Sequence, residues 1–169
     1  MKSINASDYF DLVMKGFDKA KQKYETEEMT IIAEDIFRIV WMTSVKFNSF
    51  ITFADEIDIY SFQNYVRRCL ETTKQNRSRL GFPSVCNAVL ITRNAPEKVI
   101  EYALKRPAMH TSMTEYSIVV DLATGKTHYY TGPILYGIIY AKFEREYIDG
   151  HFALPLRYLK DKKGNKGKK

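Results

Sequence analysis

The chain has 169 residues, of which 45% are hydrophobic and 27% are charged, and this composition excludes general disorder, a collagen-like repeat and a low-complexity filament. The formal net charge of +6 belongs entirely to residues 157–169, which contain seven Lys or Arg and one Asp. Residues 1–156 are neutral in sum, and a basic tail is weaker evidence for nucleic-acid binding than a basic face on the body. We predict one globular domain over residues 1–159 and a disordered basic tail over residues 160–169.

The N-terminal part, residues 1–80, has the hydrophobic spacing of about three helices. The expected helices cover 7–24, 29–42 and 58–79, and a short strand or an irregular link is expected at 47–53. Apolar residues cover most of the circumference of the second helix, so this helix is expected to be central to the domain or covered by a second chain. Gly81 and Pro83 end the helical part.

The C-terminal part, residues 81–159, changes to short β-rich runs that alternate with amphipathic segments, which predicts a β-α-β-β-α-(β) order. The expected strands cover 85–92, 116–122, 126–130 and 151–159, with helices between Asn94 and Pro107 and at 134–149. A helix is favoured over a strand at 134–149 because Pro133 and Gly150 suit its two ends. Pro155 places the last strand at an edge of the sheet.

The predicted fold class is α+β, a mixed α/β fold in which the N-terminal helical part packs on a C-terminal unit with a small mixed sheet. The order of elements in that unit is compatible with a ferredoxin-like half. The segment 116–122 is too apolar for the edge position that it would occupy there. We therefore favour a sheet in which 85–92 and 116–122 are adjacent and parallel, with 126–130 outside them as an edge.

Cysteine usage and hydropathy bear on the compartment. Cys69 and Cys86 do not form a disulfide framework in a chain of this length, and free cysteines suit a reducing cytosol. The N-terminus has no apolar signal-peptide core, and the best apolar stretch, residues 134–141, is far shorter than the roughly 20 residues of a membrane span. We expect a soluble, cytoplasmic protein with no membrane partner.

Linear motifs for the large enzyme classes are missing from the sequence. It contains no GxxxxGK[ST] or GxGxxG phosphate loop, no GxSxG, no HExxH, no EF-hand loop and no pair of CxxC motifs. We expect no cofactor and no metal site, and we favour a protein that is not an enzyme, although an enzyme without a linear motif stays open. No motif is specific enough to name a family.

The weak candidates for a catalytic site are Asp121, Glu115 and His110. Asp121 follows an apolar strand that begins near Glu115, and carboxylates at strand ends hold Mg²⁺ in metal-dependent nucleases and hydrolases. His110 lies in the preceding loop, where it could be a general base or a ligand. We favour structural roles, in which Asp121 caps the turn before Gly125 and His110 is a surface residue, because no following strand offers a Glu-x-Lys pair.

A second hypothesis is a nucleic-acid-binding module. Its candidate phosphate contacts are cations at the end of the third predicted helix and in the tail: Arg67, Arg68, Lys74, Arg77, Arg79, Lys162 and Lys163. His128, Tyr129 and Tyr130 of the predicted hairpin could stack on bases, although only one of the two tyrosines can lie on a given face of the strand. Cations at a helix end also complement the helix dipole, and charged tails are commonly only solvated.

The preferred hypothesis is a non-enzymatic binding or assembly protein that forms a homodimer. It depends on the excess of apolar surface in the predicted helix 29–42 and on a tyrosine stripe formed by Tyr136, Tyr140 and Tyr147. The first alternative is the nucleic-acid-binding module, with a polyanion as its partner. The second alternative is a small metal-dependent nuclease or hydrolase that uses Asp121.

Overall fold

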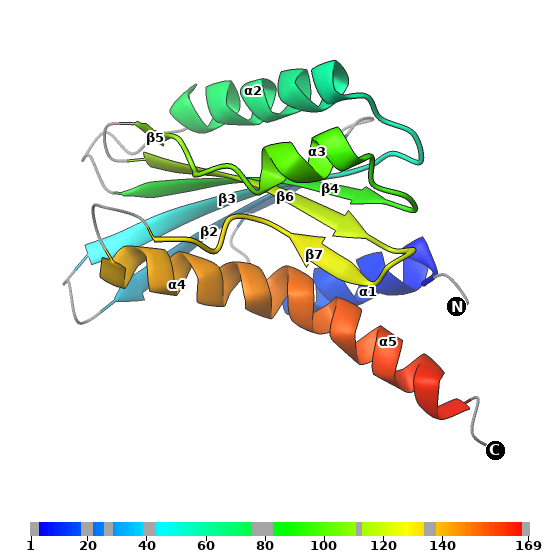
Figure 1. The fold of residues 1–169 in the computed structure, drawn as a ribbon. Coiled ribbons are helices and arrows are strands. Elements are labelled where there is room, and N and C mark those ends of the chain that lie inside the picture. Colours follow the sequence, from blue (N-terminus) through cyan, green and yellow to red (C-terminus); the bar gives the residue numbers. More distant parts are fainter. Residues whose placement is uncertain are drawn as a thin grey trace.

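The structure is a computed structural model, and it describes most of the chain. The described residues are 4–17, 22–25, 29–38, 43–75, 83–110, 113–133 and 138–166. They form a mixed α/β fold with one sheet of seven strands and helices on both of its faces (Figure 1). No helix within these residues is long and apolar enough to cross a membrane.

Helices and strands follow one another along the chain in a fixed order that begins and ends with helices. The elements are α1 (Ala6–Gly16), β1 (Gln22–Glu25), β2 (Thr30–Arg38), β3 (Thr43–Phe53), α2 (Ile59–Gln75), β4 (Ser84–Thr92), α3 (Glu97–Ala103), β5 (Met109–His110), β6 (Met113–Asp121), β7 (Lys126–His128), α4 (Ile138–Ile148), the π-helix η2 (Asp149–Ala153) and α5 (Leu154–Lys166). The strand order across the sheet is β1-β2-β3-β4-β6-β5, and β7 pairs with β6 off this path.

Two kinds of connection build the sheet. Strands β1, β2 and β3 pair antiparallel, and β4 and β6 are parallel to β3 through the crossovers of α2 and α3. Strand β4 is buried along its whole length, which explains its continuous apolar run. The hairpin from β6 to β7 turns at Gly125, whose φ of 64° suits glycine.

The sheet separates two hydrophobic clusters. Helices α2 and α3 cover one face, here called the α2/α3 face, and pack on Phe50, Cys86 and Leu90. Helices α1, α4, η2 and α5 cover the other, here called the α4/α5 face, and pack on Phe47, Val89 and neighbouring residues (Figure 1). Side chains alternate along each strand, so every central strand supplies residues to both clusters.

The predicted three-helix N-terminal part is wrong. The segment 29–42 contains strand β2, whose Ile31 packs in the α2/α3 cluster and whose Ile32 packs in the α4/α5 cluster. A strand inside a sheet is apolar on both sides, and a short apolar run of this kind has the same composition as a buried helix. The first predicted helix ends at Gly16, and β1 follows it. The third predicted helix is confirmed as α2.

The C-terminal part agrees more closely with expectation. Strands β4 and β6 are adjacent and parallel, and β7 pairs with the outer edge of β6, as the burial pattern predicted. Helix α4 confirms a helix within 134–149 for the described residues 138–148. The expected edge strand at 151–159 is wrong, because η2 and α5 occupy it, and α5 continues through Lys166 where a disordered tail was expected.

Pro155 accounts for the π-helix. In a regular α-helix its ring would clash with the carbonyl four residues earlier, and proline has no N–H to donate. The N–H of Leu154, just before Pro155, donates to the carbonyl of Asp149, five residues back, so the wider turn lies directly before the proline. Helix α1 braces this turn, because the Tyr9 hydroxyl donates to the Phe152 carbonyl at 2.9 Å.

Candidate functional site

Asp121, the main catalytic candidate of the sequence, has a structural role. It ends β6 with only 3% of its surface exposed. The backbone N–H of Ala123 donates to Asp121 Oδ1 at 2.9 Å, and the hydroxyl of Thr124 donates to Oδ2 at 2.8 Å. These bonds form the Asx cap of the hairpin turn that the sequence analysis favoured.

Glu115 and His110 do not join Asp121. Glu115 lies six residues earlier on the same strand, a separation of roughly 20 Å. The backbone of His110 pairs with that of Met113 in β5, and its side chain lies outside the described part of the chain. Within the residues that the structure describes, no three His, Cys, Asp or Glu side chains are close enough to hold a metal ion.

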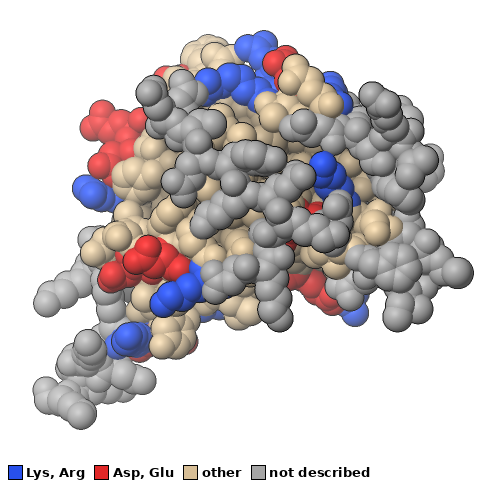
Figure 2. All heavy atoms as spheres, turned by 180° about the vertical axis from the view of Figure 1, so that it is seen from behind, with Lys and Arg blue, Asp and Glu red and all other residues tan. Residues whose placement is uncertain are grey.

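The predicted phosphate-binding cations are divided between two faces. Arg67, Arg68 and Lys74 are exposed on α2, and Lys162 is exposed on α5. These helices cover opposite faces of the sheet, so the structure does not bring the two groups together (Figure 1). Arg77, Arg79 and the side chain of Lys163 lie outside the described residues. Figure 2 shows Lys and Arg interspersed with Asp and Glu on the side of the molecule that it displays.

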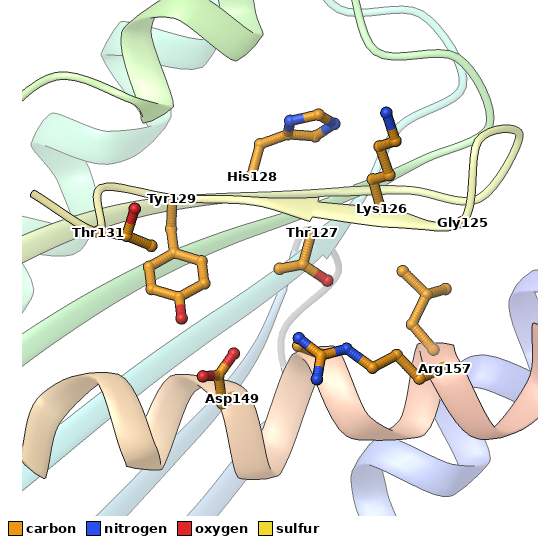
Figure 3. A pocket seen from close by; sticks show the side chains of 10 residues that line it. Gly125, Lys126, Thr127, His128, Tyr129, Thr131, Asp149 and Arg157 are labelled. Carbon is orange, nitrogen blue, oxygen red and sulfur yellow. The ribbon is translucent and has the colours of Figure 1, made fainter.

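A pocket lies between β7 and the turn from η2 into α5 (Figure 3). Its volume is about 410 Å³, within the range of small-molecule sites. The residues that line it are Gly125, Lys126, Thr127, His128, Tyr129, Thr131, Asp149, Ala153, Leu156 and Arg157. The pocket therefore joins the hairpin strand to the C-terminal helix, two elements that only the tertiary fold places together.

Alternation along β7 divides the lining residues. Thr127 and Tyr129 extend from the strand toward the helix, where they meet Asp149 and Arg157, whereas Lys126 and His128 extend to the opposite side (Figure 3). Thr127 pairs with Val120 of the α4/α5 cluster, which explains the direction of its side chain. The polar interior of the pocket thus consists of Thr127 from β7, Tyr129 just after β7, Asp149 from η2 and Arg157 from α5.

Tyr129 and Asp149 form one end of this polar interior. Burial raises the pKa of Tyr129 well above its usual value, and its hydrogen bond to the Asp149 carboxylate raises the pKa further. The hydroxyl is consequently protonated at neutral pH and donates to Asp149. A carboxylate has more acceptor sites than this one bond uses, so Asp149 can accept another donor.

Thr127 and Arg157 face each other across the other part of the pocket (Figure 3). The Thr127 hydroxyl oxygen is buried without a hydrogen-bond partner within the described residues, which costs free energy. Arg157 is exposed and makes no ion pair with any residue that the structure describes. Both groups donate hydrogen bonds, and neither has an acceptor among the described residues.

A second polar group lies in the core of the α4/α5 face. The Tyr147 hydroxyl donates to Glu34 Oε2 at 2.7 Å and lies 3.4 Å from the Ser49 hydroxyl. The Asn87 amide donates to Ser49 at 3.4 Å. His151 Nε2 lies 3.9 Å from the same Glu34 oxygen, and burial lowers the pKa of this histidine to about 4. The imidazole is therefore neutral at pH 7.

Glu144 is a second buried acid on this face. It is 5% exposed, and it accepts a hydrogen bond from the Tyr116 hydroxyl at 2.9 Å. Burial raises the pKa of Glu144 to about 7, while hydrogen bonds from Tyr116 and Thr114 oppose part of the rise. Arg145, the next residue, donates to the Gly132 carbonyl, which ties α4 to the segment after β7.

The pocket residues were not identified as a site from the sequence. Arg157 belongs to the charged C-terminal stretch, and Asp149 lies at the end of the predicted helix 134–149. Tyr129 was considered only as a base-stacking residue. The available signal was the alternation of Thr127 and Tyr129 on the predicted hairpin, which places both on one side of the strand.

Comparisons of the chain with protein-family models, curated proteins and solved structures find no match. The fold defines the chain only as a mixed α/β protein with helices on both faces of its sheet. The chemistry of the pocket is therefore the feature of this chain that points to a function.

Proposed function

We propose that this protein is a non-enzymatic binding protein that holds a small molecule in the pocket between β7 and η2–α5. One observation carries the proposal: Thr127 and Arg157, two donors without acceptors among the residues that the structure describes, lie on opposite walls of a cavity of about 410 Å³. Pockets of this size with a few converging polar groups are the usual form of ligand sites.

Binding is favoured over catalysis by the residues that line the pocket. They include no serine or cysteine, and the raised pKa of Tyr129 keeps its hydroxyl protonated and therefore a weak nucleophile. The Asp149 carboxylate is held by Tyr129 as an acceptor. This set can orient a ligand by hydrogen bonds without attacking it.

The assembly part of the original hypothesis loses both of its supports. The apolar segment 29–42 contains β2 (Thr30–Arg38), which lies between β1 and β3, so the sheet explains Ile31 and Ile32, and residues 39–42 lie outside the described residues. Tyr147 is buried, and its hydroxyl donates a hydrogen bond to Glu34. Tyr136 and the side chain of Tyr140 lie outside the described residues. The proposal therefore retains ligand binding and a cytoplasmic location, and it contains no homodimer.

The test is a thermal-shift screen of a small-molecule library, including carboxylates, phosphate esters and neutral compounds. We expect a subset to raise the melting temperature of the wild-type protein and to raise that of Arg157→Gln less. Arg67→Gln is the matched control, because it removes the same charge from α2 on the other face. Equal ligand responses in the three proteins would contradict the proposal.

A titration with a mixed-sequence oligonucleotide separates this proposal from the nucleic-acid alternative. Oligonucleotide binding that weakens in the Arg67→Gln variant and falls steeply with salt concentration would favour the alternative in which the cations of α2 contact phosphates. The proposed function predicts that Arg67→Gln leaves small-molecule binding unchanged.

A further inference from the structure

We infer that the ligand of this pocket is a small oxyanion, a carboxylate or a phosphate monoester, that also carries an amine or hydroxyl donor. The inference rests on the proposed function and specifies its ligand class. It comes from the opposite requirements of the two parts of the pocket: Thr127 and Arg157 lack acceptors, whereas Asp149 has acceptor sites to spare.

The anion is placed between Thr127 and Arg157. A guanidinium presents parallel N–H groups that match two oxygens of a carboxylate or phosphate, and charge-assisted bonds of this kind are stronger than neutral ones. A hydroxyl from the opposite wall adds a donor to the same group. The Thr127 oxygen is enclosed without a hydrogen-bond partner among the described residues, so this side chain must rotate toward the pocket before it can donate to the bound group and remove the cost of its burial.

Lys160 adds positive charge beside the turn at Gly125. The ammonium of Lys160 is 3.5 Å from the Thr124 carbonyl, and its Cδ would lie 3.2 Å from a Cβ added at Gly125. Gly125 lines the pocket, so this exposed lysine stands at the end formed by the turn. The charge there favours an anion further.

The donor of the ligand is placed at Asp149. Its carboxylate already accepts from Tyr129, which fixes the acid and leaves acceptor sites toward the pocket. A negative charge at this position repels a second anionic group, so a ligand with oxyanions along its whole length, such as a polyphosphate, is disfavoured. An ammonium or hydroxyl close to the anionic group satisfies both parts at once.

Two apolar side chains limit the rest of the ligand. Ala153 and Leu156 line the helix side of the pocket, and the backbone of β7 closes the other side. A short aliphatic group can contact these residues. The resulting ligand resembles an amino acid or an amino-alcohol phosphate in the arrangement of its charges.

Four probes test these requirements by isothermal titration. L-Leucine carries both groups, 4-methylpentanoate lacks the amine, L-leucinamide lacks the anion, and O-phosphoethanolamine replaces the carboxylate by a phosphate. Whichever of L-leucine and O-phosphoethanolamine binds more tightly identifies the anion as carboxylate or phosphate. If the anion is carboxylate, we expect 4-methylpentanoate and L-leucinamide each to bind more weakly than L-leucine.

Variants assign each part of the ligand to its partner. Arg157→Gln should weaken the tighter probe about tenfold or more, consistent with the loss of a charge-assisted pair. Asp149→Asn should weaken the amine-bearing probes and leave 4-methylpentanoate unchanged. Arg67→Gln should change none of these affinities. Melting curves of all three variants check that they are folded.

Failure of this inference differs from failure of the proposed function. If L-leucinamide binds as well as L-leucine and O-phosphoethanolamine does not bind, or if Arg157→Gln has no effect on the anionic probes, the oxyanion class is wrong. If neutral library compounds still bind and Thr127→Val weakens them, the pocket remains a binding site. If no library compound and no probe binds, both proposals are wrong.

Discussion

The two faces of the sheet solve the same packing problem with different chemistry. On the α2/α3 face, the one tyrosine hydroxyl of the buried cluster, that of Tyr65, donates within 3.1 Å of the Phe50 and Val89 carbonyls. Burial raises the pKa of Cys86 to about 12, so this thiol stays neutral. The α4/α5 face instead buries Glu144 and partly buries Glu34 and His151 among its aromatic residues.

This difference indicates which face is free to carry function. Glu144, the acid that is buried on the α4/α5 face, lowers stability where it must ionise. The acid beside Cys86 on the α2/α3 face, Glu115, is only partly buried. The ligand pocket lies on the α4/α5 side, against η2 and α5, and η2 also supplies His151. The α2/α3 face then serves as the rigid support on which the pocket is built.

The largest expected effect concerns that support. Phe62 is fully buried between α2 and the sheet and makes an edge contact with Tyr102, with ring centres 5.8 Å apart. Phe62→Ala should lower the free energy of unfolding by about 3–5 kcal/mol, because it removes contacts and leaves a cavity. Urea unfolding measures this loss. A loss below about 1 kcal/mol would show that the α2/α3 face is not the rigid support.

The next effect comes from Glu144. Its pKa of about 7 lies above the usual 4.5, so the folded state holds the proton more tightly than the unfolded state. Stability is then full below about pH 4.5 and falls as pH rises through 7, by about 3 kcal/mol in total. Glu144→Gln should remove this fall and stabilise the protein at about pH 8.

His151 has the opposite pH dependence and a smaller effect. Its pKa of about 4 lies below the usual 6.5, so stability is full above 6.5 and is lost as pH falls toward 4. We expect a loss of stability of about 2 kcal/mol, less than the full shift would give, because 21% of the His151 side chain is still exposed to solvent. His151→Phe keeps a ring stacked on Phe17 and should flatten this acid limb.

The two titrations overlap, which sharpens the comparison. Between about pH 4.5 and 6.5 the loss from Glu144 and the gain from His151 have opposite signs, so the wild-type stability should change little with pH. The free energy of unfolding of the Glu144→Gln variant should then rise with pH across this window, and that of the His151→Phe variant should fall. Chemical denaturation at several pH values reads both slopes, and parallel curves for the two variants would contradict the assignment.

The smallest effect concerns the π-helix itself. A Cβ added at Gly150 meets no atom within 4 Å, so Gly150→Ala should stabilise the protein by about 0.5–1 kcal/mol through helix propensity. Gly125→Ala is the contrasting variant, because its φ is positive and the added Cβ would press on Lys160. It should destabilise the protein, and calorimetry compares the two melting temperatures. Stabilisation by both would show that neither turn constrains the chain.

Local signals in the sequence predicted the C-terminal half better than the N-terminal half. Strand β4 and its parallel neighbour β6 were predicted because each is a short apolar run bounded by turns, and the Asx cap of Asp121 followed from its place before Gly125. Strand β2 was not predicted from the sequence, because a strand with apolar residues on both sides has the same pattern as a buried helix. Only its pairing with β3, a non-local property, decides between the two.

The candidate site was hidden for the same reason. Thr127 and Arg157 are thirty positions apart. The segment that contains Arg157 was expected to be an edge strand, and nothing in the sequence placed it beside Thr127. The missing partner of the Thr127 hydroxyl is a property of the folded molecule. The sequence pattern therefore assigned Arg157 to an edge strand, whereas the structure places it in α5 on the wall of a pocket.

The most direct test of ligand binding is a chemical-shift map of the isotope-labelled protein during titration with O-phosphoethanolamine and, separately, with L-leucine. The account predicts saturable shifts, for at least one of the two, in the backbone amides of β7 and of η2 and α5, with Thr127, Asp149 and Arg157 among the largest. Shifts confined to α2 around Arg67 and Arg68, or no saturable shift with either compound or any library hit, would contradict it.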